Sequence, residues 1–421
     1  MNTRCWNIDD KRIRGHGQNT GPGARLCLLI CVILWAGLSG CVSQTIKSTS
    51  VPGLQSPARE VPEGELLDIG VAIFDPGIDV ADEDERIYPE VRRAEARYMP
   101  ALLAEVLQNA GAWGAVRVLP DEGRVADLRV SGTILHSDGE ELKLHILARD
   151  SRGYVWLDKT YTARASRYAY DSKTRSNYDP FQAVYHTIAN DLLQRLDELP
   201  TAQRQEIRMI SELLFARSFS GDAFAGYLDE TRKGKLLVVR LPSEDDPMLE
   251  RIRKLRERDH VFVDTMQGYY DGFSSDMSGP YQEWRRLSYQ EVVAYQELKA
   301  ESLQQLIVGG ASIIAGIAAA GSGNNATRAA GNVAIIGGGY LLKSGLESRA
   351  EAQIHVEAME EIGQSLEAEI TPQVIVLEDR TVMISGNVDD QYAQWREVLA
   401  EIYRNEIGDL AVPGPDDVVQ N

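Results

Sequence analysis

The sequence predicts an α+β fold with an N-terminal α/β domain, a helical middle and a small α-β-β-α unit near the C-terminus. Two observations support this prediction. Apolar and polar residues alternate over 141–150, which is typical of a strand with one face in water. Over 94–110 and 346–366, apolar residues recur every three or four positions, which is typical of helices. Breaks rich in Gly, Pro and Asn separate these stretches.

The first folded region is predicted over 65–200. Its opening strand ends at the breaker Asp75-Pro76-Gly77, and Gly111 is a suitable stop for the helix before it. Tight turns join the later strands into an antiparallel meander. The predicted elements are a strand over 66–74, a helix over 94–110, strands over 115–119, 127–136, 141–150 and 154–162, and a helix over about 181–196.

This order of elements resembles the small α/β domain of curli-secretion-channel lipoproteins and of the Tol-system propeller protein's N-terminal region. The likeness rests on four stretches: Val71-Ala72-Ile73-Phe74, the Trp113 segment, the strand 126–134 (Ala-Asp-Leu-Arg-Val-Ser-Gly-Thr-Ile) and the turn 148–153 (Ala-Arg-Asp-Ser-Arg-Gly). It covers about 130 residues. The resemblance implies a fold and carries over no catalytic residue.

The first 40 residues have the layout of a bacterial leader. A basic segment precedes an apolar run over 26–38, and the run of 13 residues is shorter than the ~20 that a spanning helix needs. The run ends in Leu38-Ser39-Gly40-Cys41, which resembles the lipobox of bacterial lipoproteins. The resemblance implies that 1–40 is a signal peptide and that Cys41 carries the lipid, palmitate included. In enterobacterial lipoproteins, an aspartate after the lipidated cysteine marks retention in the inner membrane. Position 42 is valine here, so the resemblance implies the outer membrane.

Composition limits the chemistry of the mature chain. All four cysteines lie in the first 41 residues, so cleavage leaves no pair for an intramolecular disulfide and no cysteine metal site. The leader carries five Lys/Arg and two Asp/Glu, so its removal takes the formal net charge from −19 to −22. Such a charge argues against nucleic acid as a partner and against broad adhesion to anionic headgroups. Acyl chains would supply the membrane attachment.

The remaining segments are assigned by composition and period. Residues 41–64 are rich in Ser, Thr, Pro and Gly, which predicts a disordered tether, and the tail over 408–421 is also predicted to be disordered. Residues 201–305 are charged and mostly helical. Residues 346–407 predict a helix, a β-hairpin and a second helix capped by Asp389. This unit faintly resembles the small lipid-binding modules of bacterial envelope proteins.

Residues 306–345 form an apolar, glycine-rich stretch. A Gly/Asn turn joins two runs, Ile307–Ala320 and Ala329–Leu342, and predicts an antiparallel helical hairpin. Each run would be ~21 Å long as a helix, against ~30 Å of hydrocarbon. The hairpin resembles the glycine zippers of envelope proteins, and it is either buried or self-associating in protein or inserted in a membrane. Small residues recur at a spacing of four and would let helices approach closely: Ala311, Ala315, Gly316, Ala319, Ala330, Ala334 and Gly338.

The motif Tyr-x-x-Trp-Arg occurs twice, as Tyr281/Trp284/Arg285 and as Tyr392/Trp395/Arg396. Spacing of three places Tyr and Trp on one helix face, which suits a recognition patch for a glycan strand or a protein. The alternative interpretation is that these aromatics belong to the core and use their polar atoms there.

Catalytic motifs are absent from the sequence. The histidines lack metal-ligand spacing, and no nucleophile elbow, phosphate loop or dinucleotide fingerprint occurs. We therefore expect a non-enzymatic lipoprotein without cofactor or metal, anchored in the outer membrane and facing the periplasm. Its expected role is structural, in assembly or in export, through self-association or another envelope protein. The alternatives are a periplasmic lipid- or glycan-binding module and, further off, an envelope hydrolase.

Overall fold

The computed structural model describes residues 42–47, 51–79, 88–120, 124–170, 179–243, 245–319, 357, 361, 373–376 and 381–408. The chain divides into two compact units, Met1–Val42 and Ser43–Asn421, and all described residues except Val42 belong to the second. Several predicted features lie outside the described residues. These are the lipobox with Cys41, the second run of the glycine-rich hairpin, most of the helix over 346–366, and the tail from 409.

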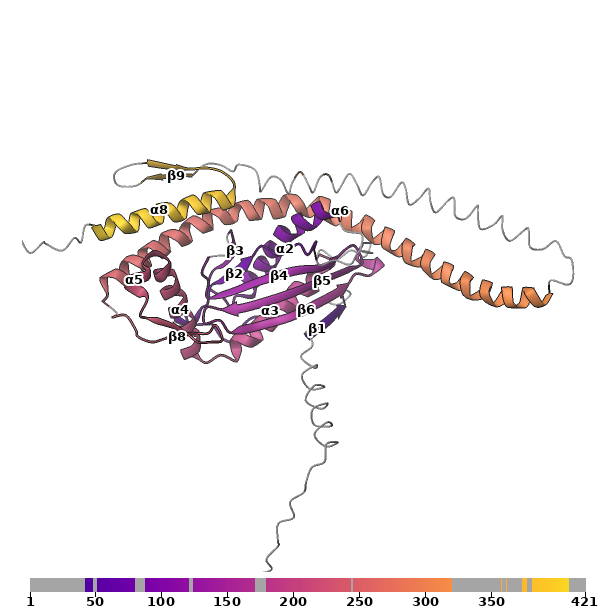
Figure 1. The fold of residues 1–421 in the computed structure, drawn as a ribbon, viewed down its shortest axis with the longest axis horizontal. Helices are drawn as coiled ribbons and strands as arrows, with labels where there is room; N and C mark the ends of the chain where they lie inside the picture. Colours follow the sequence, from indigo (N-terminus) through magenta and orange to yellow (C-terminus); the bar gives the residue numbers. More distant parts are fainter. Residues whose placement is uncertain are drawn as a thin grey trace, which may run out of the picture. The chain divides into compact units, whose positions relative to one another are not determined.

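A six-stranded mixed sheet forms the centre of the fold (Figure 1). The fifth strand in the sheet order, β2, is parallel to both of its neighbours, β3 and β4, whereas β4, β5 and β6 form an antiparallel meander. The α+β prediction is confirmed. In sheet order the strands are β1 (Val42–Lys47), β6 (Val155–Arg164), β5 (Glu141–Asp150), β4 (Leu128–Ser137), β2 (Ile69–Ala72) and β3 (Val116–Leu119).

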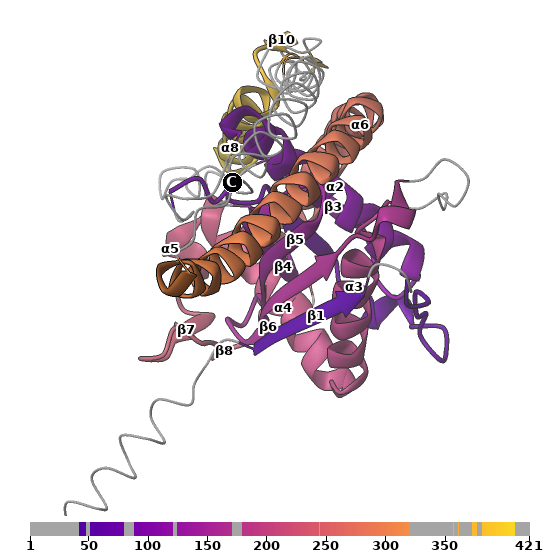
Figure 2. The same cartoon turned by 90° about the vertical axis from the view of Figure 1, so that its right-hand side faces the viewer.

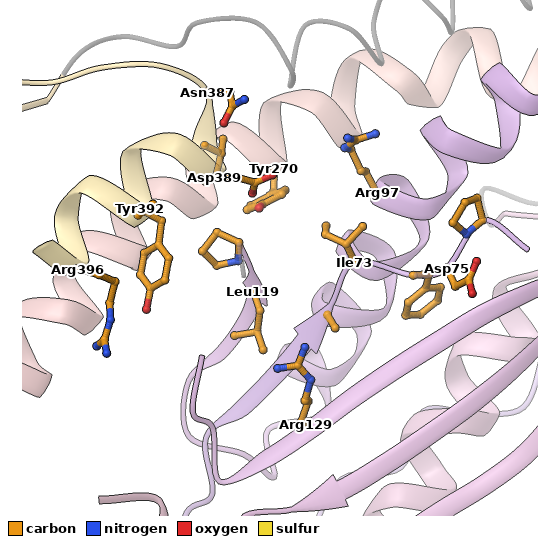
Figure 3. Close-up of a pocket in the computed structure, with 16 residues that line it drawn as sticks. Ile73, Asp75, Arg97, Leu119, Arg129, Tyr270, Asn387, Asp389, Tyr392 and Arg396 are labelled. Carbon is orange, nitrogen blue, oxygen red and sulfur yellow. The ribbon is translucent and has the colours of Figure 1, made fainter. Parts of the chain in front are cut away.

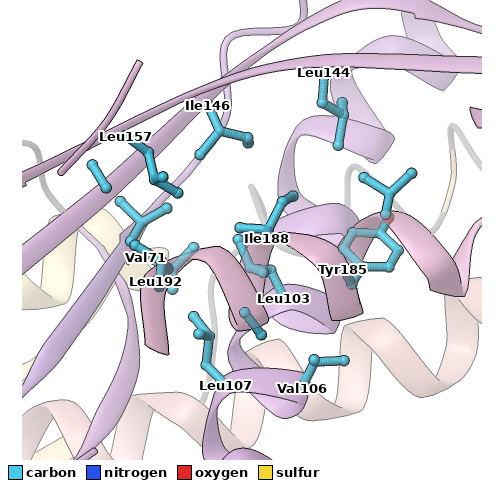
Figure 4. Close-up of a cluster of buried hydrophobic side chains, with 14 of the residues drawn as sticks. Val71, Leu103, Val106, Leu107, Leu144, Ile146, Leu157, Tyr185, Ile188 and Leu192 are labelled. Atoms are coloured by element: carbon cyan, nitrogen blue, oxygen red, sulfur yellow. The ribbon is translucent and has the colours of Figure 1, made fainter. Parts of the chain in front are cut away.

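Two helices complete the α/β core. Helix α2 (Pro89–Ala110) crosses from β2 to β3, begins with proline at its first turn and ends at Gly111, whose φ of 68° only glycine adopts easily. Helix α3 (Gln182–Asp197) follows the meander. Figure 4 shows apolar side chains of both helices facing those of the strands. The buried side chains include Leu103, Leu107, Ile188, Leu192, Val71, Leu144 and Ile146.

The helical middle is confirmed in outline. Helices α4 (Thr201–Phe219) and α5 (Gly221–Phe224) precede α6 (Pro247–Ala319), a continuous helix of 73 residues. Helix α6 runs through Pro280 and through the predicted boundary at 306, so the charged arm and the first apolar run are one helix. Between α5 and α6 lies a small hairpin that the sequence did not predict, β7 (Leu228–Glu230) with β8 (Leu236–Val238).

The C-terminal unit contains the predicted hairpin and helix. Strands β9 (Gln373–Val376) and β10 (Thr381–Ile384) are antiparallel, and α8 (Val388–Gly408) follows. The cap of α8 differs from the prediction, because Asn387 replaces Asp389 in that role. The Oδ1 atom of Asn387 accepts from the N–H of Asp390 at 2.8 Å, and Asp390 Oδ2 accepts from the N–H of Asn387 at 3.4 Å.

The predicted disordered tether over 41–64 is wrong for the described part of that segment. Strand β1 pairs with the edge strand β6, and residues 51–55 lie along α3. Asn190 of α3 accepts from the N–H of Gln55 at 2.9 Å and donates to the Gly53 carbonyl at 3.0 Å. Val51 and Leu54 pack against the core. The composition of this segment did not predict strand β1, because backbone pairing at a sheet edge needs few apolar side chains.

Candidate functional site

A cleft of about 910 Å³ opens beyond the carboxyl ends of β2 and β3 (Figure 3). Strand β2 ends at Ala72 and β3 at Leu119, and both residues line the cleft. The other walls come from α2, α6 and the first turns of α8, which lie far apart in the sequence. In open sheets with parallel strands, ligands bind in crevices at this end of the strands.

Three arginines line the cleft, each from a different element: Arg97 of α2, Arg129 of β4 and Arg396 of α8. Figure 3 shows the three side chains around the opening, together with the carboxylates of Asp75 and Asp389. Three cations against two anions leave a small positive excess. Guanidinium groups present planar forks of N–H donors that match carboxylates and phosphates, so the cleft favours a ligand with an anionic group.

Neighbouring groups orient these arginines. Arg396 donates to Ser218 Oγ at 3.0 Å, and its guanidinium carbon lies 4.3 Å from the centre of the Phe219 ring. Arg129 donates to the Arg124 carbonyl at 3.5 Å, and Arg97 donates to the Arg93 carbonyl at the same distance. The last two are long hydrogen bonds, which constrain the guanidinium groups weakly.

Two tyrosines and one phenylalanine form the aromatic part of the cleft, Tyr270 of α6, Tyr392 of α8 and Phe74. Burial is the main cause that raises the pKa of Tyr270 above its ordinary value, and the carboxylate of Asp389 adds to it. Burial also raises the pKa of Tyr392 to about 12. Both phenols are therefore neutral near pH 7. The Tyr392 hydroxyl accepts from Arg124 at 3.4 Å and also hydrogen-bonds Asp259, so neighbouring residues already hold it.

The structure places the first Tyr-x-x-Trp-Arg motif in the interior. The hydroxyl of Tyr281 donates to Glu95 Oε1 at 2.5 Å, and Arg285 donates to Asp179 Oδ1 at 3.2 Å. The Trp284 ring stacks on Tyr281 with centroids 5.9 Å apart. All three side chains of the motif are buried. They thus join α6 to the α/β core and form no surface on which a glycan could lie.

The second motif reaches the cleft with two of its three side chains. Tyr392 and Arg396 line the cleft, although Tyr392 is itself buried. Trp395 is also buried and stacks on Phe262 of α6 with centroids 4.7 Å apart. The two motifs have different neighbours and do not form one patch. Ligand binding by Tyr392 and Arg396 stays a prediction.

The predicted zipper residues of the first apolar run are Ala311, Ala315, Gly316 and Ala319, and all four belong to the last turns of α6. Ala311, Ala315 and Ala319 follow one another at a spacing of four, and Gly316 is adjacent to Ala315. Ala330, Ala334 and Gly338 lie outside the described residues.

Sequence reasoning missed most of the cleft. Asp75-Pro76-Gly77 marked the end of the first strand, which locates one wall at the carboxyl edge of the sheet. Arg97, Arg129 and Tyr270 had no distinguishing pattern, because each is one polar residue in an ordinary helix or strand. They come together only through the packing of α6 and α8 on the α/β core.

The chain matches no protein-family model, no curated protein and no solved structure. Among the described residues, no group of three or more His, Cys, Asp and Glu side chains could hold a metal ion. No helix in the described ranges is both long and apolar enough to cross a membrane.

Proposed function

We propose that this chain is a non-enzymatic lipoprotein, held in the outer membrane by acyl chains on Cys41 and facing the periplasm, with a structural, assembly or export role. The lipobox supports the anchor, and helix α6 supports the role. The helix has two parts with different surroundings, and this division is the observation on which the proposed role rests.

The first part of α6 is fixed to the folded core. Buried side chains recur from Leu249 to Leu287 and pack against α2, α4 and α8. The helix then continues past the sheet to Ala319 (Figure 1), ending in the apolar run that begins at Ile307. At ~1.5 Å per residue, 73 residues make a helix of roughly 110 Å.

An apolar run with small residues on one side needs a surface to cover it. The covering surface can be the second run of the same hairpin, a second copy of the chain or another envelope protein. A long helix carrying such an end suits an assembly or scaffolding protein, because its docked part sets the direction of its apolar end.

Native mass measurement of the acylated protein after detergent extraction, with co-purified proteins identified, tests this proposal. We expect a defined oligomer or a stable complex with an envelope protein. A monomer without any partner across several mild detergents would contradict the assembly role.

A second candidate function is the binding of an anionic ligand in the cleft, which would make the chain a periplasmic lipid- or glycan-binding module. The three arginines favour it. Short-chain phosphatidylglycerol, with an anionic phosphate, and a glucuronate-containing disaccharide, with an anionic carboxylate, distinguish a lipid ligand from a glycan ligand. Calorimetric titration should show that one of these probes binds the wild type and binds Arg129→Gln more weakly. The absence of binding heat with both probes would contradict this function.

A further inference from the structure

The β7–β8 hairpin has an apolar face turned to solvent. Leu237 of β8 is 45% exposed, and Val239 and Leu241, which follow β8, are 64% and 60% exposed. Their neighbours Leu236 and Val238 pack against the core. A strand with one face in water normally carries polar residues at the outward positions. Three aliphatic residues there indicate a surface that meets something other than water.

A turn of the main sheet extends this face. Tyr154 and Val155, where β6 begins, are 46% and 38% exposed and line the same small pocket as Leu237. The hairpin is attached to this turn, because the N–H of Leu236 donates to the Arg152 carbonyl at 2.9 Å. We call the five residues Tyr154, Val155, Leu237, Val239 and Leu241 the hairpin surface.

Cationic side chains lie along the hairpin. Residues 228–241 contain four cations, Arg232, Lys233, Lys235 and Arg240, against Asp229 and Glu230, and the acidic run Glu244-Asp245-Asp246 follows. The hairpin itself therefore has a positive excess in a chain with a net charge of −19. The Nζ atom of Lys235 lies 4.3 Å from the centre of the Tyr154 ring, so cation and aromatic are already paired. Aliphatic side chains, tyrosine and long cationic side chains together are typical of protein surfaces that lie in a lipid headgroup layer.

The predicted anchor holds the same sheet. Strand β1 starts at the residue after Cys41 and pairs with β6 at the sheet edge (Figure 2), and β6 begins at Val155 of the hairpin surface. Acyl chains on Cys41 would keep this edge close to a bilayer, where tethering raises the effective concentration of a weak second contact to about the millimolar range. A small surface then suffices for docking.

We propose that the hairpin surface docks on the anionic phospholipid surface of the membrane that holds the acyl chains. This inference rests on the proposed lipid anchor and adds a second membrane contact to it. The domain would then lie on the bilayer in one orientation, with the apolar side chains among the headgroups and the cations beside lipid phosphates.

The mature chain allows a direct test, because its single cysteine would be acylated and unable to react with a thiol label. Val239→Cys, labelled with an environment-sensitive fluorophore, is reconstituted as full acylated protein in vesicles of phosphatidylethanolamine and phosphatidylglycerol. Met383→Cys on β10, which replaces a side chain that is 67% exposed, is the matched control. Doxyl-labelled lipids then quench fluorophores in the headgroup layer, and iodide quenches those in water.

We expect lipid quenching at position 239 that exceeds that at 383 several-fold and falls when phosphatidylglycerol is omitted. Equal quenching at the two positions would overturn the proposal. Protection of position 239 from iodide without lipid quenching would also overturn it, because a protein surface would then cover the hairpin.

The two proposals fail separately. A free Cys41 would take up a second label, visible by mass, and would refute the anchor. Flotation of the Cys41→Ala chain with anionic vesicles then decides the hairpin surface by itself. Binding that is lost in the double variant Leu237→Ser and Val239→Ser supports the surface, and binding that the double variant retains overturns it.

Discussion

Gln267 of α6 hydrogen-bonds both backbone groups of Val118 on the edge strand β3. Its Oε1 accepts from the Val118 N–H at 2.8 Å, and its Nε2 donates to the Val118 carbonyl at 3.1 Å. Beside this pair, Arg117 donates through two nitrogens to the carboxylate of Asp264, at 2.5 and 3.0 Å. The long helix therefore covers a sheet edge that would otherwise expose unpaired backbone groups.

Substitution of Gln267 should weaken this attachment. In Gln267→Leu the N–H and carbonyl of Val118 lose their partner, and burying an unsatisfied polar group costs ~1–3 kcal/mol. We expect a loss of that size in the free energy of unfolding, measured by urea denaturation. Thr265→Ala, at an exposed position of the same helix, should change the value by less than about 0.5 kcal/mol. Equal midpoints for the two variants would show that α6 is not docked on β3.

The turn between β4 and β5 provides a second test of helix docking. A Cβ added at Gly139 would clash with the backbone of α6 at Arg285 and Tyr289, and backbone atoms cannot move aside as a flexible side chain can. The N–H of Gly139 also donates to Ser288 Oγ at 3.1 Å. Gly139→Ala should therefore lower the thermal midpoint markedly. Gly64→Ala, where a Cβ meets open space, is the control and should leave the midpoint nearly unchanged.

The sequence predicted the parts of the fold that depend on local periodicity. The meander and α2 follow from alternation and helical spacing, and their bounds agree within a few residues, apart from the start of α2 at Pro89. Strands β1, β7 and β8 were missed, because two have only three residues and the third uses backbone pairing in a polar stretch.

The cleft could not be predicted in the same way. Arg97 and Arg129 belong to the α/β core, and Tyr270 and Arg396 join them only when α6 and α8 pack on it. The Tyr281 motif shows the reverse case, because a pattern that suits recognition is buried by contacts with Glu95 and Asp179 that are more than 100 positions away in the sequence. Local patterns therefore identified elements, whereas the choice between core and surface depended on long-range packing.

Glu95 should make stability depend on pH. Its side chain is fully buried, and burial raises its pKa above the ordinary value, although Arg92, Arg285, Ser137 and Tyr281 oppose the shift. A folded-state pKa above the unfolded value means that the folded chain holds an extra proton in the window between the two. The stability from this group is therefore full below about 4.5, the unfolded value, and is lost as pH rises toward the folded pKa.

Comparison of the wild type with Glu95→Gln isolates this contribution. The stability of the variant relative to the wild type should increase as pH rises above about 4.5, measured by urea denaturation at a series of pH values. A flat difference for Glu95→Gln would contradict the burial argument.

Asp138 should show the opposite pH dependence. Burial raises its pKa, but the hydrogen bonds from His136 and from the N–H groups of Glu140 and Glu141 outweigh burial and leave the pKa below the ordinary value. The Asp138→Asn variant should therefore be less stable than the wild type near neutral pH, and this difference in the free energy of unfolding should shrink as pH falls.

Cys41→Ala should abolish lipid attachment, because acylation needs a cysteine thiol and Cys41 is the only cysteine of the mature chain. We expect unprocessed precursor or a soluble form, and no incorporation of radioactive palmitate. Cys31→Ala, in the apolar run of the leader, should be labelled like the wild type. Palmitate in the Cys41→Ala protein would refute the lipoprotein interpretation.

The apolar end of α6 should be sensitive to the size of its small residues. Gly316→Leu with Gly338→Leu adds bulk where helices are predicted to touch, and overpacking costs ~1–3 kcal/mol. We expect lower oligomer mass or a lower urea midpoint, whereas Ile313→Leu with Ile335→Leu keeps the volume and should be milder. Both pairs should leave the α/β core folded, because the buried α6 side chains that pack on the folded core lie between Leu249 and Leu287, well before position 313. If the two pairs behave alike in both measurements, the small residues make no contact, and the proposed assembly role loses its main support.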